Sequence, residues 1–120
     1  MDEKRAEQLE ALETLAEFNE RVLKNLSILI KELSGERLDD TDKFQESIIN
    51  AINWEIEVLN ATFDVINEGV ERLNKEAVNE KIIGLSEALK SGEDTKLAAA
   101  FEKLLPVLEK LDKAVKEVLA

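Results

Sequence analysis

Residues 97–118 read LAAAFEKLLPVLEKLDKAVKEV, and their large apolar side chains recur at steps of three and four. Such steps place side chains on one side of an α-helix, so the stretch predicts a helix with one continuous apolar face. A face of that length must be buried against other helices. The residues of the repeat are Leu97, Phe101, Leu104, Leu108, Leu111, Val115 and Val118.

The same spacing occurs in three earlier segments, and turn residues such as Ser34-Gly35 and Ser91-Gly92 separate the segments. We therefore predict an all-α fold: an antiparallel up-and-down helical bundle of four helices in one domain, residues 1–120. The third helix is short, which leaves part of the first uncovered, and Pro106 bends the last. The second helix either breaks at Gly69 or continues through it, and we favour the break. The helices are expected at about 2–33, 42–68, 71–90 and 94–119.

Polar residues at special positions indicate how these helices begin and pair. Asp42 with Gln45 resembles a capping box at the start of the second helix, and Asp94 is expected to cap the last. Helix capping also explains the acidic segment 39–42 better than a calcium loop does. Asn19 is the one polar residue in the repeat of the first helix, where a buried asparagine can fix helix register.

The second helix carries two apolar stripes instead of one. Its core repeat is Ile49, Ile52, Ile56, Leu59, Phe63 and Ile66, and a second stripe lies on another side. A helix that is apolar over so wide an arc is buried on more than one side. Either it is the central helix of its own bundle, or the second stripe meets another copy or another protein. The third alternative is that the stripe consists of scattered exposed apolar residues. The candidate interface residues are Phe44, Ala51, Trp54, Val58, Ala61 and Val65.

Composition argues against several classes of function. The formal net charge of −11 repels phosphate backbones and anionic membranes, so neither nucleic acid nor membrane is an expected partner. Histidine and cysteine are absent, and no glycine-rich phosphate loop occurs. We therefore expect no catalytic, cofactor-binding or metal-binding residues and no enzymatic activity. The N-terminal sequence lacks an apolar signal segment, so a cytoplasmic location is expected.

Two charged features of the sequence each have an ordinary and a functional interpretation. Glu55 lies between the two stripes of the second helix, and we expect it to be solvated or paired with lysine, not catalytic. Lys96, Lys103 and Lys110 recur every seven residues in the last helix. We expect them to form a solvated edge facing the acidic helices, the alternative being a strip that binds an acidic partner.

The segments INWEIEVLN (52–60) and LSEALKSGEDTKLAAAFEKLLPVLEKL (85–111) resemble a family of small acidic all-helical bacterial proteins of uncharacterised function. The likeness covers residues 20–111; it implies a helical fold and transfers no catalytic residues. A designed bundle would also lack Cys, His and Tyr, but mid-helix asparagines and Pro106 are unlike an idealised design.

The expected function is that of a protein-protein interaction or self-association module, adaptor- or chaperone-like, whose partner or second copy binds the second helix. The alternative is a small-molecule or lipid carrier with its ligand between the helices near Phe18, Trp54, Phe63 and Phe101.

Overall fold

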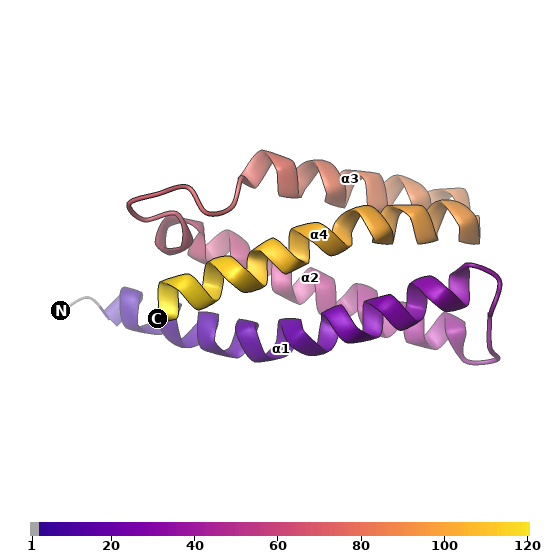
Figure 1. The fold of residues 1–120 in the computed structure, drawn as a ribbon, viewed down its shortest axis with the longest axis horizontal. Coiled ribbons are helices and arrows are strands. Elements are labelled where there is room, and N and C mark those ends of the chain that lie inside the picture. Colours follow the sequence, from indigo (N-terminus) through magenta and orange to yellow (C-terminus); the bar gives the residue numbers. More distant parts are fainter. Residues whose placement is uncertain (1–2) are drawn as a thin grey trace.

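The computed structural model describes residues 3–120 and places four helices along a molecule of 51 × 24 × 19 Å (Figure 1). Successive helices run antiparallel, so the chain ends beside the start of the first helix (Figure 1). The predicted all-α bundle with a short third helix is confirmed, and the expected start at residue 2 lies outside the described residues. The helices are α1 (Glu3–Leu33), α2 (Thr41–Ile66), α3 (Lys75–Ser91) and α4 (Asp94–Leu119).

The helix that packs against each of the other three is α4. α1 packs against both α2 and α4 along its length, whereas α3 packs chiefly against α4. α2 packs mainly against α1, so it is not the central helix that one interpretation of its two stripes required. The short α3 does leave a groove, but the groove lies beside α4 and not beside α1. The most deeply buried large side chains are Leu12, Leu15, Leu26, Leu29, Leu33, Ile52, Leu59, Ile66, Phe101, Leu104, Leu108 and Leu111.

The connection between α1 and α2 is organised by Thr41 rather than by the predicted capping box at Asp42. The Thr41 hydroxyl donates to the Glu32 carboxylate at 2.7 Å and accepts the backbone N–H of Leu38 at 2.8 Å. Thr41 is fully buried, so its hydroxyl needs both partners. α2 therefore begins one residue earlier than expected, because its start is fixed by a carboxylate at the end of α1.

Arg37 draws the acidic segment 39–42 towards α4. Its guanidinium donates to Asp42 at 2.6 Å and to the two carboxylate oxygens of Asp94 at 2.8 and 2.9 Å. These hydrogen bonds from Arg37 lower the pKa of Asp94. The residue that precedes α4 is Glu93, and it makes no side-chain capping bond. The predicted cap at Asp94 is wrong because a distant arginine takes its carboxylate.

The connection between α2 and α3 confirms the favoured break. α2 ends at Ile66, and Gly69 adopts a φ of 80°, a left-handed conformation that favours glycine. The Asn67 side chain then orders the chain: its Oδ1 accepts the backbone N–H groups of Arg72 and Leu73 at 2.8 and 3.0 Å. Its Nδ2 donates to the Leu73 carbonyl at 2.9 Å. Asn67 therefore fixes the path of the chain up to Leu73, and the Asn74 side chain caps α3 by accepting the backbone N–H of Ala77 at 2.8 Å.

Replacing Asn67 by alanine is expected to lower the free energy of unfolding by about 2 kcal/mol, because it leaves partly buried backbone groups without partners. Urea denaturation followed by circular dichroism measures the change. Asn60→Ala, on the exposed side of α2, is the matched control and should change stability by less than about 0.5 kcal/mol. Equal losses in the two variants would contradict the role given to Asn67.

Pro106 lies on the exposed side of α4, and the helix continues through it. Because proline has no N–H, the Glu102 carbonyl one turn earlier lacks its helical donor. Figure 1 shows the axis of α4 changing direction about halfway along, as the sequence predicts.

Candidate functional site

Two helices contribute aromatic side chains to the face that contains Trp54. Phe18 of α1 and Trp54 of α2 are in edge-to-face contact, with ring centroids 4.8 Å apart and ring planes at 65°. The guanidinium carbon of Arg21 lies 5.7 Å from the centroid of the Phe18 ring. Both aromatic residues are partly buried. The nearest aromatic neighbour of Trp54 therefore belongs to the same chain, while part of the indole still meets solvent.

The candidate interface residues occupy three environments. Val65 is only 3% exposed and belongs to the core, whereas Ala61 is exposed. The remaining four residues are partly buried against the core and keep an exposed side. We call these four together with Phe18 the Trp54 face: Phe18, Phe44, Ala51, Trp54 and Val58.

The two apolar stripes of α2 are the flanks of one broad face. Ile49, Ile56 and Phe63 were predicted as core positions, but they are only partly buried and form one flank. The Trp54 stripe forms the other flank. The most buried side of α2 therefore lies between the two predicted stripes, because α1 packs against the middle of the apolar arc. The most buried positions along this middle are Ile48, Ile52, Glu55, Leu59, Thr62 and Ile66.

A groove of about 240 Å³ lies between α1 and α2 and is continuous with the Trp54 face. Its lining is largely apolar, and Arg21 is the one charged residue in it. This low density of charge is unusual for a chain in which 36% of residues are charged. The lining residues are Phe18, Arg21, Val22, Asn25, Phe44, Ser47, Ile48 and Ala51.

Two polar side chains lie in the core next in sequence to the aromatic pair. Asn19 and Glu55 follow Phe18 and Trp54 in sequence, and one residue turns a side chain by about 100° around a helix, here towards the core. Both polar side chains are 0% exposed. Asn19 Nδ2 donates to the Leu108 carbonyl of α4 at 2.9 Å. Within residues 3–120, Asn19 Oδ1 and both carboxylate oxygens of Glu55 have no hydrogen-bond partner.

Burial raises the pKa of Glu55 from 4.5 to about 8, and no charged neighbour contributes to the shift. The side chain is therefore mostly protonated and neutral near neutral pH. The expectation that Glu55 is solvated or paired with lysine is wrong. The sequence did contain a sign of this burial, since Glu55 lies in the middle of the apolar arc of α2.

The aromatic residues that a carrier would use do not meet around one cavity. Phe101 is fully buried in the packed core. Phe63 lies on the opposite flank of α2 from Trp54, with the Lys75 ammonium 5.5 Å from its ring centroid. Phe18 and Trp54 lie at the surface between α1 and α2. A ligand between the helices would need another place.

A second groove, of about 530 Å³, lies between α3 and α4 and was missed from the sequence. Lys103 and Lys110, two of the three lysines in the seven-residue repeat of α4, line it. The groove was missed because the third helix was expected to begin at about 71, whereas α3 begins at Lys75 and leaves this part of α4 uncovered. The other lining residues are Arg72, Leu73, Asn74, Ala77, Val78, Lys81, Glu102, Pro106 and Val107.

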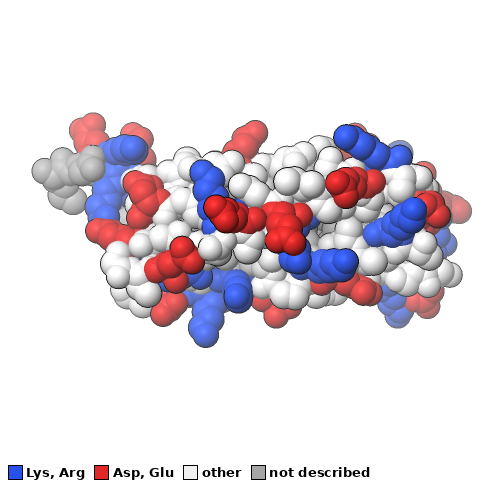
Figure 2. All heavy atoms as spheres, turned by 90° about the horizontal axis from the view of Figure 1, so that it is seen from above, with Lys and Arg blue, Asp and Glu red and all other residues white. Residues whose placement is uncertain are grey.

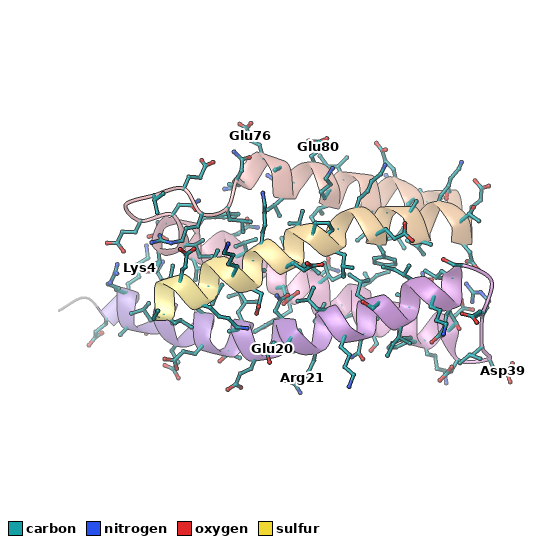
Figure 3. All side chains as sticks on the ribbon, viewed as in Figure 1. Lys4, Glu20, Arg21, Asp39, Glu76 and Glu80 are labelled. Atoms are coloured by element: carbon teal, nitrogen blue, oxygen red, sulfur yellow. The ribbon has the colours of Figure 1, made fainter. Side chains whose placement is uncertain are left out.

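Acidic side chains are numerous but dispersed. Glu76 and Glu80 point away from the bundle on the outer side of α3 (Figure 3). Asp39 lies at the end of the molecule where α1 and α2 are connected (Figure 3). Within residues 3–120, no group of three or more Asp, Glu, His or Cys residues is placed to hold a metal ion. No helix in this part of the chain is long and apolar enough to cross a membrane.

Comparison with protein families matches residues 10–114 to a family described as Domain of unknown function (DUF8042). The match covers most of the chain and extends beyond the residues 20–111 on which the sequence resemblance rested. Neither the search of curated proteins nor the search of solved structures found a match.

Proposed function

Because the chain belongs to the DUF8042 family, whose function is not established, we propose its function from geometry: it is a non-enzymatic interaction module. It binds a helix of a partner protein along the Trp54 face, as an adaptor or chaperone-like protein would. The observation that carries this proposal is the partly buried Phe18–Trp54 pair beside an apolar groove with a single charged residue.

The shape and chemistry of the Trp54 face suit helix recognition. Partner helices commonly place apolar side chains, spaced by three and four residues, into a groove between two helices. Tryptophan is enriched among the residues that dominate binding energy at such interfaces. Trp54 is braced by Phe18, so it loses little conformational freedom when a partner covers it.

The negative charge of the protein favours a partner helix that carries basic residues. Glu57 lies one turn from Trp54 on the exposed side of α2, and Glu17 precedes Phe18 on the exposed side of α1. With a net charge of −11, the protein attracts a helix whose apolar face is flanked by basic residues. Association of two copies would bring like charges together, and their repulsion is strongest at low ionic strength.

The proposal assigns no catalytic step. Glu55 is the carboxyl group whose pKa lies near neutrality, but its side chain is 0% exposed and cannot contact a substrate. Its burial stabilises the neutral form, and no ligand at the surface can exchange a proton with it.

The proposal is tested with a synthetic amphipathic peptide of about 18 residues, roughly 27 Å long as a helix, with a leucine face and lysine flanks. Trp54 is the single tryptophan and tyrosine is absent, so protein fluorescence reports this face directly. We expect saturable binding with a blue shift of the emission, weakened by salt. The same peptide with glutamate flanks should not bind.

Paired variants separate the Trp54 face from overall charge. Asn25→Lys with Ser47→Lys places two charges at exposed positions of the groove and should abolish binding. Asn79→Lys with Ser86→Lys makes the same change of net charge at exposed positions of α3 and should preserve most of it. Light scattering of the protein alone should give a monomer. If the protein is instead a dimer, and the Asn25/Ser47 variant is monomeric, then the face binds a second copy and not a partner helix. If both variants weaken peptide binding equally, the proposed site is wrong.

A further inference from the structure

We propose that the groove between α3 and α4 binds a small amphipathic anion, a negatively charged headgroup on a short aliphatic chain. This site is separate from the Trp54 face, and the inference does not depend on the proposed function. It rests on the charge of the rim, the fixed position of one arginine and the apolar floor.

The rim gathers positive charge in a strongly negative protein. Arg72, Lys81, Lys103 and Lys110 line the groove together with one acidic residue, Glu102. No ion-pair partner of Lys81, Lys103 or Lys110 is found among residues 3–120. Several lysines outside the groove also lack such a partner among the described residues, so what distinguishes the rim is that four cations line one groove beside a single carboxylate. Unpaired cations that converge on one groove lower the free energy of a bound anion.

Arg72 is held in place before any ligand arrives. Its Nη1 donates to the carbonyls of Ile66 and Glu68 at 2.9 and 3.0 Å, and its backbone N–H donates to Asn67. Its Nε is buried and has no hydrogen-bond partner within the described part of the chain. Because this nitrogen is closed to solvent, a bound anion would interact with the positive charge of the guanidinium as a whole. A fixed guanidinium also loses little freedom on binding.

The floor of the groove is apolar and supplies a place for an aliphatic chain. Leu73 and Val78 are 4% and 3% exposed and belong to the core. Pro106 and Val107 of α4 form the opposite wall. The volume of about 530 Å³ falls within the usual range for small-molecule sites, about 300–1,000 Å³. The groove exists because α3 begins only at Lys75, which leaves this part of α4 uncovered.

The surroundings of the groove favour a small anion over a polyanion. Figure 2 shows acidic and basic side chains interspersed on the face over α3, with no broad basic area. Glu76 and Glu80 project outwards from α3 near the groove (Figure 3). A nucleic acid would need a continuous basic track and would meet these carboxylates, whereas a single headgroup at the rim avoids them.

The test is an NMR titration of the isotopically labelled full chain with sodium decanoate and with decyl phosphate, both below their micelle concentrations. We expect saturable amide shifts confined to residues 72–81 and 102–110. Decyltrimethylammonium, with the same chain and the opposite charge, should not produce them. The relative affinities of the two anions show whether the headgroup is a carboxylate or a phosphate.

A matched pair of variants assigns the binding to the rim. Lys103→Glu with Lys110→Glu should weaken binding by about tenfold or more, the loss expected when charge-assisted contacts are removed. Lys24→Glu with Lys113→Glu changes the net charge equally at exposed positions outside the groove and should leave the affinity within about twofold. Thermal unfolding confirms that both variants are folded. Equal weakening, shifts spread over the whole molecule, or equal binding of the cationic amphiphile would each overturn the proposal.

Discussion

Replacing Glu55 by glutamine is expected to abolish most of the loss of stability that the wild-type protein shows as the pH rises from 4.5 to about 8. Burial raises the pKa of Glu55 to about 8 in the folded protein, whereas the unfolded chain keeps the ordinary value of 4.5. Between these values the folded state retains a proton that the unfolded state releases, so the free energy of unfolding falls with rising pH. At about 1.4 kcal/mol per pKa unit, the fall approaches about 5 kcal/mol.

The pH dependence is measured by urea denaturation at several pH values between 4.5 and 8. The stability that protonated Glu55 supplies is complete below the lower value and is lost as the pH passes the higher one. Glu80→Gln, an exposed residue of α3, is the control and should retain the wild-type slope. Asp94 does not interfere, because Arg37 lowers its pKa from 3.8 and moves its titration below this window. A wild-type slope in Glu55→Gln would show that the carboxylate is solvated.

Glu55→Leu removes both the ionisable group and its polar atoms. Leucine removes the buried polar atoms that lack partners, so this variant should be more stable than the wild type at neutral pH. Together the two substitutions separate the cost of ionising Glu55 from the cost of burying a polar side chain. The core at this level keeps a polar group that packing alone does not require.

The sequence predicts most helix ends to within two residues, because each repeat has the period of an α-helix and each break contains glycine or asparagine. The exception is the start of α3, which was expected at about 71 and lies at Lys75. The starts of α2 and α4 lie within one residue of the expected positions, but the contacts that fix them were not predicted. Thr41 takes its partner from Glu32, and Asp94 takes its partner from Arg37, so both starts depend on contacts between segments distant along the chain. Local capping patterns contain no information about such partners.

The candidate sites were harder to predict than the helices for a related reason. The Trp54 face was found because Trp54 breaks the amphipathic pattern of α2 locally. The groove beside Pro106 was not found because it depends on where α3 begins and on which helices are neighbours. The apolar arc of α2 fits a central helix equally well, and only the packing of α4 against all the others decides between the two arrangements.

Phe101→Ala is expected to lower the free energy of unfolding by about 3–5 kcal/mol, whereas Phe63→Ala should cost roughly half as much. Both residues lie in predicted core repeats, but Phe101 is fully buried in α4 and Phe63 keeps an exposed side on α2. Truncating Phe101 leaves a cavity in the packed core, while solvent fills the space left by Phe63. Urea denaturation of the two variants at one pH gives the comparison. Equal losses would place α2, and not α4, at the centre of the bundle, because a central α2 would enclose Phe63 as fully as α4 encloses Phe101.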